Sequence, residues 1–403
     1  MSCYLMYLTV FIMFFQPTSI FPWMEAAQPL RNAAIIAFIA YLFAAKKSSH
    51  GFMEINTNRF FVLFAVMQVI SSAFVWLTGA VETLNLWIRI GIVYFLITQL
   101  VTDEKKVRMV ALMMVLGLAY LSYFSISNYV VDYIPGLRAG AFGWYENPND
   151  LAIILVTAIP LALLLANTST SFLGRLLYMA LAAMFTFNVL FTGSRNGLLG
   201  LMAVGVIGIM SSYKIPKLLR SCLIIGLVGA VLTVGVSNVL TRSDLQGHVS
   251  GDESSESRIE QWKAGARMLV HNPLFGIGRE QFPDRASDYG GIHGMYPHNT
   301  LVQVFSETGL PGGIFFVMFA VYPLYEARRY FQRPRKKTPV LSAVGAYRFI
   351  IAALVGFWAC AFFSNRYQYY ILYVLVALVV AIKENIIKPQ ESTEADVPLE
   401  NPA

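Results

Sequence analysis

Three side chains in this sequence combine a chemically useful type with a conspicuous position. Arg195 lies in a very short polar stretch, 192–197, between two apolar segments. Arg258 lies in the longest polar stretch, 241–298, and His298 lies where that stretch meets the next apolar segment. Guanidinium groups neutralise a diphosphate through paired hydrogen bonds, and a neutral imidazole can take the proton of an attacking hydroxyl. The three residues together indicate group transfer with a diphosphate as the leaving group.

Each of the three also has an ordinary structural explanation. An arginine at the edge of a hydrocarbon layer can extend to lipid head groups, an arginine on an amphipathic helix usually faces solvent, and a histidine at the start of a helix can cap it. The functional interpretation gains weight because all three are expected on the same side of a membrane. We expect no metal, because no i, i+4 pair occurs among the nearby histidines, which are His248, His271, His293 and His298.

The composition indicates that these residues belong to a membrane protein. The chain of 403 residues is 57% hydrophobic and only 13% charged, whereas soluble domains are about half apolar and a quarter charged. Lipid offers no hydrogen-bond partners to the backbone, so spanning segments must be helices or closed barrels. Because the apolar runs are long and lack the alternation of strands, we expect an all-α, polytopic membrane protein.

Apolar runs of spanning length predict twelve transmembrane helices. They lie near 3–20, 30–45, 60–77, 86–101, 107–126, 150–166, 173–192, 196–212, 218–240, 299–326, 343–363 and 368–386. The first run has no basic residues before it and no clear small-x-small site after it, so we expect a helix there rather than a cleaved signal peptide.

The positive charges predict the orientation. Loops and span ends on one side carry about two-thirds of the 30 basic residues, and the other side carries more than half of the 23 acidic ones. Cytoplasmic loops are rich in Lys and Arg, so we expect both termini in the cytoplasm and the stretch 241–298 on the opposite face. The net charge of +7 is then a topology signal, and no nucleic-acid partner is expected. The cysteines, all in or beside predicted spans, indicate neither a disulfide framework nor a metal site; they are Cys3, Cys222 and Cys360.

We expect one membrane domain, 1–387, with a long outer loop at about 241–298, followed by a short cytoplasmic tail, 388–403. Within the loop, 256–270 predicts an amphipathic helix that lies against the membrane surface or the top of the bundle. Its apolar face is expected at Ile259, Trp262, Ala266 and Leu269. At such a membrane surface, the arginines and the histidine indicate glycosyl transfer from a lipid diphosphate, with direct attack and inversion at the anomeric carbon.

The order of short motifs resembles the O-antigen ligase and Wzy-like polysaccharide polymerase superfamily of bacterial inner-membrane glycosyltransferases. The resemblance covers roughly 142–316. Its motifs are Asn-Pro-Asn-Asp-Leu-Ala at 147–152, Gly-Ser-Arg-Asn-Gly at 193–197, Ser-Arg-Ile-Glu-Gln-Trp at 257–262, Asn-Pro-Leu-Phe-Gly-Ile-Gly at 272–278, Pro-His-Asn-Thr-Leu at 297–301 and Glu-Thr-Gly-Leu-Pro-Gly-Gly at 307–313.

This resemblance implies a twelve-span fold with a periplasmic catalytic loop and a donor glycan on undecaprenyl diphosphate. It implies that Arg195 and Arg258 hold the diphosphate and that His298 activates the acceptor hydroxyl. Supporting substrate-binding residues would be Asn149, Asn299, Glu307 and Arg279. No cofactor is expected. The expected partners are the lipid-linked donor, a glycan or lipid A core acceptor, the bilayer and other polysaccharide-assembly proteins.

The sequence leaves several functions open. The acceptor would be the lipid A core in a ligase and another glycan chain in a polymerase. A protein O-oligosaccharyltransferase is less favoured, because the C-terminal side carries no large extra domain. A flippase of the lipid-linked glycan belongs to a different class, and it would place polar residues in mid-membrane. The N-terminal third carries no motif, so Arg31, Arg89 and Glu25 are expected to be interfacial residues.

Overall fold

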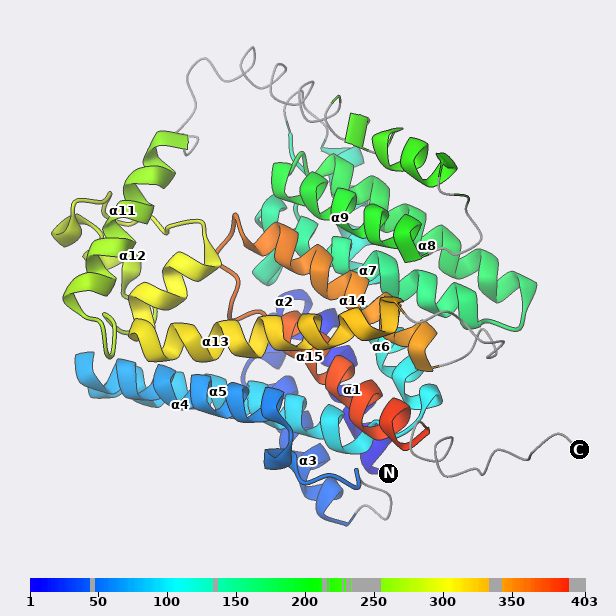
Figure 1. Cartoon of the computed structure of the whole chain (residues 1–403), viewed down its shortest axis with the longest axis horizontal. Helices are drawn as coiled ribbons and strands as arrows, with labels where there is room; N and C mark the ends of the chain where they lie inside the picture. The colour runs from blue at the N-terminus through cyan, green and yellow to red at the C-terminus, as the bar shows by residue number, and fades with distance from the viewer. Residues whose placement is uncertain are drawn as a thin grey trace, which may run out of the picture.

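The computed structural model describes residues 1–43, 48–132, 137–211, 216, 218–226, 228–229, 233, 255–332 and 343–390. Throughout these ranges the chain is helical and forms no strand (Figure 1). The predicted all-α class is therefore confirmed.

Eight helices of the described residues are long and apolar enough to cross a membrane. They are α4 (Asn56–Val75), α5 (Leu77–Leu100), α6 (Glu104–Val131), α7 (Pro148–Thr168), α8 (Phe172–Phe191), α13 (Thr300–Gln332), α14 (Ala343–Ala361) and α15 (Tyr370–Ile382), which continues into the π-helix η5 (Lys383–Ile387). Three shorter apolar helices are α1 (Ser2–Phe15), α3 (Pro29–Leu42) and α9 (Arg195–Ser211). The chain is thus a multi-pass helical membrane protein.

The smaller elements connect these helices. They are α2 (Pro17–Ile20), η1 (Pro22–Met24), η2 (Phe52–Glu54), η3 (Gly143–Tyr145), α11 (Ser255–His271), α12 (Phe282–Arg285) and η4 (Ser287–Tyr289). The predicted span 218–240 lies mostly outside the described residues, so the total of twelve spans stays a prediction. The outer-loop residues 241–254 and the tail residues 391–403 also lie outside them.

Two predicted span boundaries were wrong. The first helix ends at Phe15 and not near residue 20, because Gln16 adopts a left-handed backbone (φ 50°) and Pro17 begins a separate short helix. The fourth predicted span begins at Leu77 and not at 86, because only Trp76, with an extended backbone, separates α4 from α5. The polar residues after Leu77 therefore belong to a helix and not to a loop.

Helix α7 lies at the centre of the bundle. It packs against α8, α14, α9 and α6, and 89% of the residues in its most apolar 18-residue stretch are buried. Helices in lipid associate through close van der Waals packing, which small residues allow. A Cβ atom at Gly200 of α9 would lie 2.4 Å from Cys360 Sγ, and one at Gly356 of α14 would lie 2.6 Å from Val204 Cγ2. The two helices are therefore close enough to place the start of α9 beside the end of α14.

Helix α13 is divided by a kink at Gly309, whose backbone (φ 69°, ψ −173°) is not helical. The helix packs both against α4 in the bundle and against α11. Figure 1 shows α11 and α12 together at one end of the bundle, while α15 runs toward the other end. We call residues 255–299 the cap.

The cap has its own small hydrophobic cluster, formed by Met268, Ile277, Phe282 and Ala286. Helix α11 confirms the predicted helix 256–270, but the predicted apolar face was wrong. Ile259 is 49% exposed, and Ala266 is also exposed. The buried side chains include Gln261, Ala264 and Met268, because α11 packs on α13: a Cβ atom at Gly265 would lie 2.4 Å from Val302 Cγ1.

Candidate functional site

The turn before Arg195 is held by a network centred on Asn149. The turn spans only residues 192–194, and Arg195 is the first residue of α9. Asn149 Oδ1 accepts hydrogen bonds from Ser194 Oγ and from Arg138 Nη2, both at 2.8 Å. Arg138 Nε also donates to the carbonyl oxygen of Thr192 at 2.8 Å. Asn149, predicted to support substrate binding, therefore fixes the turn that presents Arg195, whose own side chain is exposed.

The residue after Asn149 forms a buried ion pair. Both carboxylate oxygens of Asp150 accept hydrogen bonds from the Arg366 guanidinium, and only 4% of Asp150 is exposed. The same guanidinium lies over the ring of Tyr369, 5.0 Å from its centroid. Burial raises the pKa of the Tyr369 phenol, although the charge of Arg366 opposes this. The Tyr369 phenol therefore stays protonated and can donate a hydrogen bond. The Asp150–Arg366 pair fixes the start of α7 to the connection between α14 and α15.

That connection also joins two other parts of the site. Asn196 Nδ2 donates to the carbonyl oxygen of Phe363 at 2.8 Å. Thr300 Oγ1 donates to the carbonyl oxygen of Ser364 at 2.7 Å, and the backbone N–H of Arg366 donates to Thr300 Oγ1 at 3.1 Å. Residues 363–366 thus bring the start of α9 and the start of α13 to the same place.

His298 occupies the junction between the cap and α13. Its backbone is left-handed (φ 47°), and the next residue, Asn299, caps α13 by accepting hydrogen bonds from Leu301 N and Val302 N at 2.9 and 3.0 Å. His298 lies within electrostatic range of the Asp150 carboxylate. Asn299, predicted to support substrate binding, acts here as the helix cap.

Arg258 reaches the same region through α11. Trp262 Nε1 on this helix donates to the carbonyl oxygen of Pro297 at 2.7 Å. Arg258 lies one turn earlier, and residues four apart share a face of a helix. Arg258 is half-buried. The segments that carry Arg195, Arg258 and His298 are therefore all anchored around residues 297–300 and 363–366.

Glu307 lies in the part of α13 before the kink at Gly309 and is fully buried. Gln303 Nε2 donates to Glu307 Oε1 at 3.0 Å, and the Tyr367 hydroxyl donates to Oε2 at 2.7 Å. The backbone carbonyl oxygen of Glu307 accepts from Ser71 Oγ at 2.5 Å and from Gly278 N at 3.1 Å. Glu307 therefore ties the cap, α4 and the α14–α15 connection together.

Arg279 extends this network into the cap. Arg279 Nη2 donates to Gln368 Oε1 at 2.9 Å, and Gln368 Nε2 donates to Glu280 Oε1 at 2.6 Å and to the Tyr367 hydroxyl at 2.8 Å. The Tyr296 hydroxyl donates to the other Glu280 oxygen. Burial raises the pKa of Tyr296, and the Glu280 carboxylate raises it further. Tyr296 therefore stays protonated and keeps this bond.

Two glycines allow the backbones of the motifs at 272–278 and 307–313 to pack closely against each other. Gly276 and Gly309 both have positive φ angles, 66° and 69°, which glycine adopts without strain. A Cβ atom at Gly276 would lie 2.3 Å from the Glu307 carbonyl carbon, and one at Gly309 would lie 2.7 Å from that of Leu274. The backbones of the two motifs are also joined by the hydrogen bond from Leu310 N to Pro273 O at 2.7 Å.

Sequence reasoning missed three residues that organise the site. Asp150 lies inside a motif that was identified, but no role was given to it. Arg366 lies in the short connection between the last two spans, the same setting that drew attention to Arg195. Arg138 had no motif around it, and only the fold brings it to Asn149.

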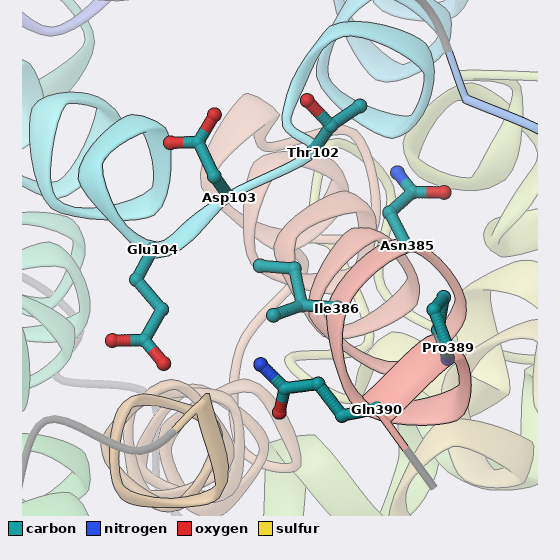
Figure 2. A pocket seen from close by; sticks show the side chains of 7 residues that line it. All are labelled: Thr102, Asp103, Glu104, Asn385, Ile386, Pro389 and Gln390. Atoms are coloured by element: carbon teal, nitrogen blue, oxygen red, sulfur yellow. The ribbon is translucent and has the colours of Figure 1, made fainter. Parts of the chain in front are cut away.

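No group of three or more His, Cys, Asp or Glu side chains that could hold a metal ion occurs among the described residues. An open cavity of ≈ 610 Å³ lies where the α5–α6 turn meets the end of α15, away from the cap (Figure 2). Figure 2 shows the Asp103 and Glu104 carboxyl groups pointing away from each other. Asp103 accepts a bond from Lys106 N, and Asn385 donates to the Thr98 carbonyl oxygen. Asp103 thus caps α6 and Asn385 connects the end of α15 to α5, and we do not assign the site there.

Comparison with known proteins identifies the class. Residues 177–317 match the family model described as O-Antigen ligase. The match extends from α8 into α13 and includes Arg195, Arg258 and His298, whereas the motif at 147–152 lies outside it. A search of the curated proteins found no match. This match supports the resemblance seen in the sequence: residues 177–317 are similar to the O-antigen ligase and Wzy-like superfamily, a family of glycosyltransferase-like enzymes.

Proposed function

We propose that this protein transfers a glycan from undecaprenyl diphosphate to a sugar hydroxyl at the periplasmic face of the bacterial inner membrane, as an O-antigen ligase with the lipid A core as acceptor. The observation that carries the proposal is the convergence of three distant segments beside His298. Trp262 joins the cap to Pro297, and residues 363–366 join the starts of α9 and α13. The family match over 177–317 supports the same chemistry.

His298 is the proposed general base. It takes the proton of the acceptor hydroxyl as that oxygen attacks the anomeric carbon, and the bond from this carbon to the diphosphate oxygen breaks with inversion. The left-handed backbone at His298 costs energy in a residue other than glycine, and such conformations concentrate at functional sites.

The two arginines are proposed to hold the diphosphate. Arg195 begins α9, a helix of 17 residues, where free backbone N–H groups and the helix dipole also favour an anion. Arg258 projects from the face of α11 that contacts Pro297 through Trp262. Guanidinium groups from two different elements can neutralise the charge that develops as the diphosphate leaves.

A transfer assay with purified protein, undecaprenyl-diphosphate-linked glycan and acceptor tests the proposal. Asparagine tolerates left-handed backbone, so His298→Asn preserves the turn while removing the base. We expect its rate to fall about 10²- to 10⁴-fold. The matched control is Arg175→Gln on α8, an exposed arginine that donates a hydrogen bond to the Ser169 carbonyl oxygen. Full activity of His298→Asn would show that the base is assigned wrongly.

The products of the same assay separate the remaining functions. Glycan joined to the lipid A core supports the ligase, and glycan joined to a second donor supports the polymerase. Glycan joined to a protein supports an oligosaccharyltransferase. Movement of the lipid-linked glycan across a bilayer without any transfer would instead support a flippase.

A further inference from the structure

A groove with two arginines lies on the N-terminal helices, apart from the candidate site. Two adjoining cavities of ≈ 320 and ≈ 370 Å³ share Arg31 of α3 and Arg89 of α5. These volumes are at the lower end of those of small-ligand sites. The rest of the lining is mixed. Its apolar side chains include Ile12, Met13, Leu30, Ile35, Ile88 and Ile92, and its polar ones include Gln16, Ser19, Gln28 and Asn85. The groove therefore combines fixed positive charge with surface suited to hydrocarbon.

The position of Arg89 makes its charge costly without a partner. It lies in the middle of α5, a helix of 24 residues, next to Ile88, which is 49% exposed. Arginines within membrane spans are expensive and mark binding sites or ion pathways. Arg89 Nε donates to the Asn85 carbonyl oxygen at 3.1 Å, but a carbonyl does not neutralise the charge. The groove thus retains a positive charge beside exposed apolar surface.

Arg31 adds a second positive charge to the same groove. Its side chain is exposed at the start of α3, whose neighbouring Ile35 and Ile36 are 42% and 53% exposed. Glu25 also lines the groove, yet across the described ranges neither arginine forms an ion pair with it or with another carboxylate. One carboxylate against two guanidinium groups leaves a net positive charge.

We propose that this groove binds a lipid whose phosphate-containing head group has a net negative charge. Two guanidinium groups on neighbouring helices suit a phosphate, because each can donate paired hydrogen bonds to its oxygens. The isoleucines on α3 and α5 provide the surface for the first carbons of the lipid chains. A polar solute without a tail would leave this apolar surface uncovered.

An aromatic wall separates this lipid groove from the candidate active site. Trp144, which lines the groove together with Tyr370, stacks on the Tyr370 ring with centroids 5.4 Å apart and planes 11° apart. The next residue, Tyr145, packs edge-on against Tyr369 at 6.0 Å. Tyr369 in turn lies under the Arg366 guanidinium. A lipid in the groove would therefore touch the back of the wall that supports the Asp150–Arg366 pair.

Native mass spectrometry of the full-length protein tests the proposal. Dioctanoyl phosphatidylglycerol, dioctanoyl phosphatidylcholine and glycerol phosphate are added in turn at equal concentrations. We expect phosphatidylglycerol to bind most strongly. The variant carrying both Arg31→Gln and Arg89→Gln should bind it at least about tenfold more weakly, because each interfacial arginine contributes about 1 kcal/mol to binding an anionic lipid. The variant with Arg31→Lys and Arg89→Lys should retain most of the binding.

The control carries Arg59→Gln and Arg175→Gln, two exposed arginines outside the groove that bond to backbone carbonyl oxygens. It should bind phosphatidylglycerol like the unaltered protein. Equal binding by the Arg31→Gln, Arg89→Gln variant would overturn the proposal. So would glycerol phosphate binding as tightly as phosphatidylglycerol, because the apolar lining would then contribute nothing. The outcome does not depend on transfer activity, so it is independent of the proposed function.

Discussion

The arginines around the candidate site and those of the N-terminal lipid groove are used in opposite ways. Arg366 is paired with buried Asp150, Arg138 holds Asn149 and Thr192, and Arg279 binds Gln368. In the groove, Arg31 and Arg89 have no carboxylate partner among the described residues. The arginines around the candidate site hold the scaffold together, whereas those of the groove leave their charge available to a ligand.

This comparison sharpens the interpretation of Arg195. It lies beside the scaffold arginines, yet its side chain is exposed and forms no ion pair within the described ranges. In this respect it resembles Arg31 and Arg89 more than its neighbour Arg138. Position near the site therefore does not decide whether an arginine binds substrate. We propose that the availability of its guanidinium does, and variants of both kinds can test this difference.

The largest effect is expected at the scaffold ion pair. Asp150→Asn leaves the partly buried guanidinium of Arg366 without its counter-charge; breaking a fully buried pair costs about 3–5 kcal/mol, which is the upper limit for this loss. The thermal unfolding of the detergent-solubilised protein measures this loss. The double variant Asp150→Asn with Arg366→Gln should recover part of the stability, because neither charge then remains. A single variant as stable as the unaltered protein would contradict the scaffold role.

Arg195→Gln should show the reverse pattern. Because the side chain is exposed, we expect thermal stability to change little. Transfer should slow by about 10²-fold or more, as when one charge-stabilising group of an active site is removed. Rates measured over a range of donor concentrations check this. Loss of stability together with activity would place Arg195 among the scaffold arginines and break the comparison.

The loss of transfer in Arg138→Gln should be smaller than in Arg195→Gln and should have a different cause. It removes the donors to Asn149 Oδ1 and to the Thr192 carbonyl oxygen, and such charged hydrogen bonds contribute about 1.5–3 kcal/mol. The turn at 192–194 should loosen, so stability and transfer should fall together. Hydrogen exchange of the Ser194 and Gly197 amides, whose N–H groups bond within this turn, should accelerate. Unchanged exchange with reduced transfer would instead suggest that Arg138 contacts the substrate.

The sequence was sufficient for the class of fold, and it proposed the segments of the candidate site. Apolar length gives the spans, and turn and charge patterns locate Arg195, Arg258 and His298, because these signals are local. The α11 helix was predicted for the same reason. Its buried face was not, because the choice between Ile259 and Met268 depends on how α11 meets α13.

Contacts between distant residues are the part that the sequence did not reveal. Asp150 and Arg366 are separated by 216 positions, and nothing in either local pattern predicts their pairing. Asn149, Asn299 and Glu307 were predicted to bind substrate, but each has structural partners in the fold. Their predicted roles in substrate binding stay predictions, and the distant structural partners of Asn149 and Glu307 are contacts that local patterns could not reveal.

The smallest effect is expected from removing metal ions. If the guanidinium groups of Arg195 and Arg258 neutralise the diphosphate, as proposed above, no divalent cation is needed for that purpose. Transfer in EDTA-treated buffer should therefore equal transfer with added Mg²⁺. The same measurement on Arg195→Gln adds a sharper test, since Mg²⁺ should not restore its rate. Strong inhibition by EDTA that Mg²⁺ reverses would contradict the argument, because a cation would then be performing the task assigned to Arg195 and Arg258.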